Sequence, residues 1–125
     1  MNTFDELCKK LTQDVANTIV LGRSWNESEQ LRFNYAVRHL LIGLWKKHHT
    51  HPDNHSSMQK NKNFYSALKQ YRDPQLTYRM AIHAFDGLQE LDMIYVVQDG
   101  YYDSIKMEGS LTRYKATHRL TEMFE

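Results

Sequence analysis

Cysteine, proline and long apolar runs are scarce in this sequence of 125 residues. Cys8 is the only cysteine, which excludes an intramolecular disulfide and a zinc site built on several cysteines. The longest apolar run, residues 40–45, is far shorter than the roughly 20 residues of a membrane-spanning helix. Residues 1–6 carry no basic region followed by an apolar run, so no signal peptide is indicated. We therefore expect a cytoplasmic protein without membrane insertion.

Motifs of catalysis are also lacking. The sequence contains neither a glycine-rich phosphate loop nor the motif of a nucleophile elbow. A Cys–His pair is the remaining option, but Cys8 falls on an apolar helical stripe, where a small core residue is expected. We expect no enzyme activity and no cofactor.

Charge is balanced in total and uneven along the chain. The 16 basic and 15 acidic side chains give a net charge of +1. Residues 1–30 carry three basic and five acidic side chains, residues 31–83 nine and two, and residues 84–125 four and eight. The net charge therefore runs −2, +7 and −4. Nucleic-acid binding would depend on a local basic face, and the middle block is the candidate.

Apolar residues at spacings of three and four predict helices over residues 3–21, 27–48 and 77–92. Thr3 with Glu6, and Asn26 with Glu29, match capping boxes, and Thr77 can cap the third helix. The expected buried stripes include Cys8, Leu11 and Val15, then Phe33, Val37, Leu40, Leu41 and Leu44, then Met80, Ala81, Ala84, Phe85 and Leu88. Gly87, within the third stripe, permits close approach of a neighbouring helix.

Helix 27–48 carries a second apolar stripe, made of Leu31, Tyr35, Ile42 and Trp45. A helix that is apolar on most of its circumference is central in a fold or buried in an oligomer. Two arrangements stay open: a homodimer through helices 3–21 and 27–48, or both helices packed on the core of one chain.

The hydrophobic period changes after residue 92. Residues 94–97 and 110–116 read as strands, and in the second Thr112 and Tyr114 face one way while Leu111 and Arg113 face the other. Asp99-Gly100 can itself form a tight turn, so a tight hairpin plus a third strand competes with the preferred long hairpin, whose tip lies near 103–109. Residues 48–63 are expected as a loop, 63–71 as a short helix, and 117–125 as a helix capped by Thr117.

Residues 27–116 resemble the winged helix-turn-helix domain in the order of their elements, which is a helix, a short helix, a turn, a longer helix and a hairpin. The matching stretches, residues 60–66, 76–79, 88–94, 100–103 and 110–117, also resemble small bacterial and mobile-element proteins. The resemblance implies one α+β domain over 1–125, mostly helical, with a winged-helix core, an N-terminal helical extension over 3–21 and a short C-terminal helix. In winged helices the second helix of the pair enters the major groove, and the hairpin touches the adjacent backbone or minor groove.

A recognition helix needs polar side chains at its N-terminal turns, where base edges are reached. The candidates for the groove are Thr77, Tyr78, Arg79 and His83, and those for phosphates are Lys60, Lys62, Lys69, Arg72, Lys106 and Arg113. Arg79 can make a bidentate contact with guanine or hold a phosphate. We therefore expect sequence-selective binding of double-stranded DNA, in a transcriptional regulator or in a replication or maintenance factor of a mobile element.

Other interpretations stay open. Residues 60–79 can be a solvated basic surface, Tyr78 can be a core ring, and Arg113 can pair with an acid such as Asp103. The winged-helix fold also serves as a protein-interaction module without nucleic acid, which is the alternative function.

Four histidines, His48, His49, His51 and His55, are weak candidates for a metal site, since imidazole clusters bind zinc or nickel. Pro52 between them favours a loop. We expect a solvated polar loop without a functional metal, which gains charge below about pH 6.5.

Overall fold

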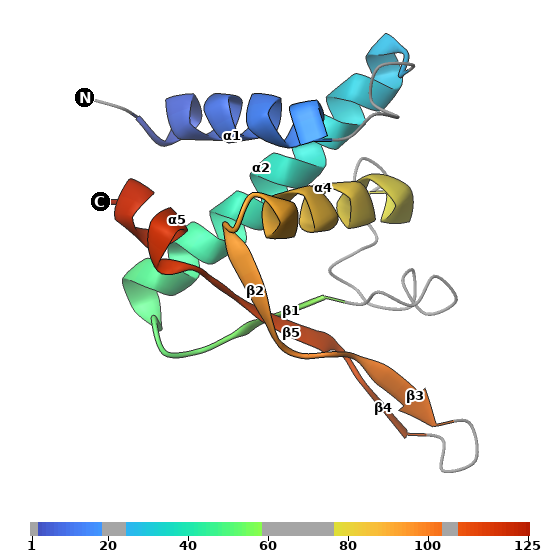
Figure 1. The fold of residues 1–125 in the computed structure, drawn as a ribbon, viewed down its shortest axis with the longest axis vertical. Helices are drawn as coiled ribbons and strands as arrows, with labels where there is room; N and C mark the ends of the chain where they lie inside the picture. Colours follow the sequence, from blue (N-terminus) through green and yellow to red (C-terminus); the bar gives the residue numbers. More distant parts are fainter. Residues whose placement is uncertain (1–2, 19–24, 59–76, 104–107) are drawn as a thin grey trace.

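Four helices and two small antiparallel sheets make up the part of the chain that the computed structural model describes, residues 3–18, 25–58, 77–103 and 108–125 (Figure 1). The helices are α1 (Phe4–Thr18), α2 (Glu27–Thr50), α4 (Tyr78–Glu90) and α5 (His118–Met123). The strands are β1 (Ser56–Met58), β2 (Ile94–Gln98), β3 (Tyr101–Asp103), β4 (Glu108–Ser110) and β5 (Thr112–Ala116). The predicted class, α+β and mostly helical, is confirmed.

Side-chain caps start the helices where the sequence predicts them. The Asn26 side chain accepts from the backbone N–H of Glu29 at 2.8 Å, and the Glu29 carboxylate accepts from the backbone N–H of Asn26 at 3.3 Å. Thr3, Thr77 and Thr117 accept in the same way at α1, α4 and α5. Each cap contributes about 1 kcal/mol by satisfying a backbone donor that has no partner within the helix.

The predicted apolar stripes of α1, α2 and α4 pack together in one core with the inner face of the sheet. The α1 stripe is buried within the same chain, as in the second of the two arrangements left open. Of the second α2 stripe, Tyr35 and Ile42 are half-buried, while Leu31 is 62% exposed. The homodimer stays a prediction.

Gly87 lies where α4 crosses α1. A Cβ atom at this position would stand 2.3 Å from Cγ1 of Val15, so only glycine allows the two helices to approach this closely. Gly43 in the middle of α2 is the opposite case, because nothing lies within 4 Å of its would-be Cβ. The close approach expected at Gly87 is confirmed.

The hairpin takes the longer of its two predicted forms. β2 and β3 lead out, and β4 and β5 return as their antiparallel partners, with a register shift between Val96 and Gln98. Beyond the shift, the backbone N–H of Gly100 donates to the buried Thr112 hydroxyl at 3.0 Å. The predicted alternation is confirmed: Thr112 and Tyr114 lie on one face, which is buried in the core, and Arg113 lies on the other face, which is exposed. Figure 1 shows the hairpin reaching away from the helices.

The prediction of a loop from residue 48 is wrong at two places. α2 continues to Thr50, whose hydroxyl donates to the Lys46 carbonyl. Residues 56–58 form β1, which pairs with β5 and gives the sheet order β1-β5-β2. The strand forms because Met58 is buried in the core and β5 offers it a free edge.

The C-terminal end of α4 is closed by a Schellman motif. The backbone N–H groups of Met93 and Asp92 donate to the carbonyls of Leu88 and Gln89, and Asp92 adopts a positive φ of 59°. Thr117 joins this end to α5: its hydroxyl donates to the Asp92 carbonyl at 2.7 Å, and its N–H donates to the Met93 carbonyl at 2.9 Å. The described ranges contain no helix long and apolar enough to cross a membrane.

Candidate nucleic-acid interface

The residues predicted to enter the major groove of DNA lie at the N-terminal end of α4. In Figure 1 this end points to the same side as the far end of the hairpin. Thr77 is the N-cap, and its side chain is committed to the backbone of Met80. The Tyr78 ring is half-buried and packs against the core, while Arg79 stands out from the first turn with 55% of its side chain exposed.

Glu29 of α2 is the partner of Arg79. The two side chains meet at 2.7 Å between Nη1 of Arg79 and Oε2 of Glu29. The hydrogen bond from Arg79, followed by the backbone bond from Asn26, lowers the pKa of Glu29. Arg79 is therefore held in place by a carboxylate while more than half of its side chain remains open to a ligand.

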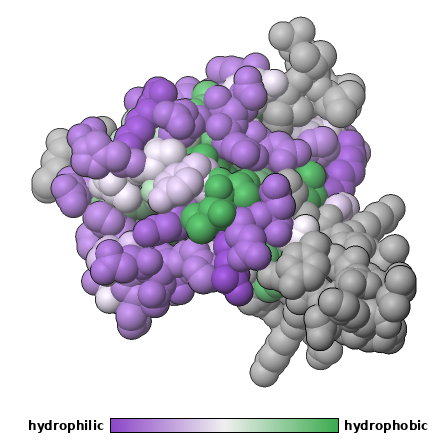
Figure 2. All heavy atoms as spheres, turned by 60° about the horizontal axis from the view of Figure 1, so that its bottom comes forward, coloured by the Kyte–Doolittle hydropathy of each residue, from purple (hydrophilic) through white to green (hydrophobic). Residues whose placement is uncertain are grey.

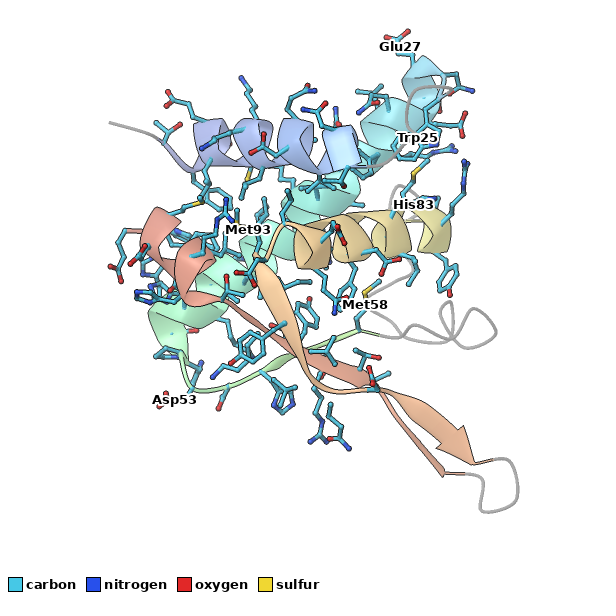
Figure 3. The ribbon with its side chains drawn as sticks, viewed as in Figure 1. Trp25, Glu27, Asp53, Met58, His83 and Met93 are labelled. Carbon is cyan, nitrogen blue, oxygen red and sulfur yellow. The ribbon has the colours of Figure 1, made fainter. Side chains whose placement is uncertain are left out.

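His83 turns toward Trp25, the residue before the α2 cap. Figure 3 shows the two side chains next to each other, and their ring centroids are 5.6 Å apart. Trp25 also packs on Phe33, and its buried indole nitrogen has no hydrogen-bond partner among the described residues. Burial, and then the nearby charge of Arg79, lower the pKa of His83. Burial therefore favours the uncharged form of the half-buried His83, and a DNA contact would use its polar edge and not its charge.

The outer sheet face, defined here as Ser57, Tyr95, Val97, Arg113 and Lys115, looks away from the core. Tyr95 is 46% exposed and stands opposite Lys115 in the register, while Val97 is 52% exposed. Arg113 is exposed between Ser57 and Gln98. The strand alternation signals this face, but Arg113 is the only residue on it that the sequence pattern predicts as a DNA contact. Figure 2 shows apolar surface among hydrophilic side chains near the middle of the face that this view brings forward.

Half of the predicted DNA contacts lie outside the described residues. These are the upstream basic residues and the cation of the hairpin tip, namely Lys60, Lys62, Lys69, Arg72 and Lys106. Asp103, the acid suggested for Arg113, has no described side chain. The structure therefore brings together Thr77, Tyr78, Arg79 and His83 at one helix end, and it places Arg113 on β5.

The four histidines are spread over two kinds of structure. His48 and His49 lie in the last turn of α2, His51 is its C-cap, and His55 precedes β1. Nε2 of His48 lies 3.2 Å from a carboxylate oxygen of Glu125. Within the described ranges, no group of three or more histidine, cysteine, aspartate or glutamate side chains could hold a metal ion.

Comparison of the chain with protein-family models, with curated proteins and with solved structures gives no match.

Proposed function

We propose that this is a cytoplasmic winged-helix protein that binds double-stranded DNA sequence-selectively, with the N-terminal turn of α4 in the major groove. The arrangement in support is α2, β1, α4 and then a long hairpin, with β1 paired to the returning strand β5. The observation that carries the proposal is the exposed Arg79 guanidinium at the first turn of α4. Regulation of transcription and maintenance of a mobile element are both roles that such binding would serve.

Arg79 supplies the specific contact in this proposal. Its planar guanidinium can donate two hydrogen bonds to O6 and N7 of a guanine. Glu29 holds the side chain in place in the free protein and competes with DNA for it. Because Glu29 is an anion beside the contact, it also weakens attraction to phosphates alone, so binding favours duplexes that offer Arg79 a well-placed base.

The test is selection of bound duplexes from a random library, followed by affinity measurements on the selected duplex at two salt concentrations. Arg79→Ala should weaken specific binding by about 1–3 kcal/mol, and Arg119→Ala, an exposed arginine of α5, is the matched control. Affinity for the selected duplex should fall steeply with salt. Equal affinity of the Arg79 variant and the parent protein for every duplex would refute the assignment.

A protein-interaction module on the same fold is the second candidate, and the exposed apolar residues favour it. Tyr95 and Val97 place apolar surface beside Arg113 and Lys115 on the outer sheet face. Aromatic residues and arginine are the residue types enriched where proteins bind proteins. Absence of duplex binding at low salt would favour this candidate over DNA binding.

A further inference from the structure

A polar groove of about 580 Å³ runs between α1 and α2. Its size falls in the range of small-molecule sites, which is roughly 300–1,000 Å³. Its polar lining includes Lys9, Gln13 and Asn17 of α1 and Gln30, Asn34 and Arg38 of α2. The groove belongs to a different helix pair from the α4 end proposed to enter DNA.

The charge of the groove is positive. Lys9 and Arg38 are both in its lining, and none of the described residues that line it is an aspartate or a glutamate. Asp5 binds Arg38 through one carboxylate oxygen, and it does so from outside the lining. A guanidinium carries five N–H donors, so Arg38 can bind a second oxyanion or exchange Asp5 for it. The lining therefore attracts an anion and offers it charged donors.

Each wall of the groove also carries an ordered pair of amides. Nε2 of Gln13 donates to Oδ1 of Asn17 at 3.1 Å, and Nε2 of Gln30 donates to Oδ1 of Asn34 at 2.9 Å. Each bond links two residues one helical turn apart and holds both side chains in position. It leaves the glutamine carbonyl as an acceptor and the asparagine NH₂ as a donor. Both walls can thus bind a ligand that has donors and acceptors of its own.

We propose that this groove binds a small molecule that carries an oxyanion, a carboxylate or a phosphate, beside neutral hydrogen-bonding groups. The oxyanion lies on Lys9 and Arg38, and the neutral polar part lies between the two amide pairs. The site goes beyond DNA binding, because the described residues of its lining all belong to α1 and α2.

The test follows the side-chain NH₂ signals of the full chain by NMR during titration with two probes. N-acetylglutamate offers carboxylates and an amide, and glycerol 3-phosphate offers a phosphate and hydroxyls, so the two arms distinguish the two oxyanions. The signals of the two amide pairs should shift and saturate with at least one probe. Failure of both probes to shift them would overturn the proposal.

Three variants tie the binding to the groove. Lys9→Gln and Arg38→Gln should each weaken binding of the effective probe about tenfold, because each removes a charge-assisted hydrogen bond. Asp5→Asn frees Arg38 without changing the lining and should tighten binding several-fold. Lys10→Gln is the matched control, since Lys10 is exposed on the same helix outside the groove. An equal loss in Lys10→Gln and Lys9→Gln would show attraction to overall charge and overturn the site.

Discussion

The two ends of α4 are built in opposite ways. The N-terminal end has one side-chain cap, a half-buried His83, and Arg79 on an exposed ion pair with Glu29. The C-terminal end has the buried Gly87 against Val15, the Schellman closure at Asp92, and the hydrogen bonds of Thr117. The C-terminal end therefore anchors the helix by close packing and hydrogen bonds, and the N-terminal end exposes the Arg79 side chain to solvent.

Side chains that protrude from a well-anchored helix can be exchanged with little change in stability, because they bury little surface. Groups at the anchored end contribute to stability through close packing and backbone hydrogen bonds. Changes at the anchored end should therefore alter the free energy of unfolding, and changes at the presented end should alter binding.

Gly87→Ala has the largest expected effect. The added methyl group would stand 2.3 Å from Cγ1 of Val15, so the cost of overpacking should reach or exceed the upper end of the usual range of about 1–3 kcal/mol. Better helix propensity offsets at most about 1 kcal/mol of it. Urea unfolding should show a net loss of stability. Val15→Ala in the same chain should make the Gly87→Ala change less destabilising than it is in the parent.

Gly43→Ala is the control for that substitution. Its new methyl group meets nothing within 4 Å, so only helix propensity changes and the protein should gain about 1 kcal/mol. A loss of stability at Gly43, or a gain at Gly87, would contradict the packing of α1 on α4.

Thr117→Val should destabilise the protein by about 1–2 kcal/mol. Valine keeps the shape of threonine but loses the hydroxyl that caps α5 and donates to the Asp92 carbonyl. Thr50→Val is the matched control, since that hydroxyl donates to a carbonyl in the exposed last turn of α2, and its effect should stay within about 0.5 kcal/mol. Equal urea midpoints for the two variants would show that the Thr117 hydroxyl does not stabilise the C-terminal end of α4.

Glu29→Gln should act on binding more than on stability. Glutamine preserves the capping box with Asn26 and removes the charge that holds Arg79. Affinity for duplex DNA at low salt should rise about threefold, since one anion beside the contact is lost. Glu27→Gln, in the same exposed turn and without a described ion pair, should change affinity less. A fall in affinity with Glu29→Gln would mean that Glu29 positions Arg79 for DNA.

The pH dependence of stability should include a contribution from His83. This effect should be smaller than those of Gly87→Ala, Thr117→Val and Glu29→Gln. Its pKa in the folded protein is lowered by burial and by Arg79, so the unfolded chain binds the proton more readily. This stability is fully present above the ordinary histidine pKa of about 6.5, and it falls as the pH drops from there toward the lowered value.

Unfolding in urea between pH 7.5 and 5.5 tests this contribution. His83→Asn should flatten the slope over that window, whereas His118→Gln, at an exposed position of α5, should preserve it. The lowered pKa of Glu29 also contributes stability that is lost on acidification, but in a lower window that runs from the ordinary carboxyl pKa downward. If the free energy of unfolding of His83→Asn depended on pH as steeply as that of the parent, charging the His83 ring would not destabilise the folded protein.

Local signals predicted most of the fold. Stripes at helical spacing and the caps at Asn26, Thr77 and Thr117 are read within a few residues of one another, so the described helices were predicted with small errors at their ends. β1 was missed because three residues are too few to show alternation, and its pairing with β5 is a long-range event.

The candidate site was predictable in its position but not in its contacts. Arg79 lies exposed at the first turn of α4, as expected, yet its bond to Glu29 joins residues fifty positions apart and has no local signal. The contact between His83 and Trp25 also joins residues that are far apart in the sequence. The α4 pattern places His83 outside the buried stripe, but it could not show which neighbour would cover the ring. Tertiary packing decides which polar groups of an exposed helix face remain open.

The hairpin leaves the helical layer at Met93 and returns to it at Thr117, where the N–H of Thr117 donates to the Met93 carbonyl. This hydrogen bond therefore joins the two ends of the hairpin, beside the C-terminal end of α4. A change in the number of residues at its far end alters the entropy of closing the loop by only about 0.6 kcal/mol for each doubling of length. The reach of the hairpin is thus a quantity that insertions and deletions can adjust while the helices keep their places.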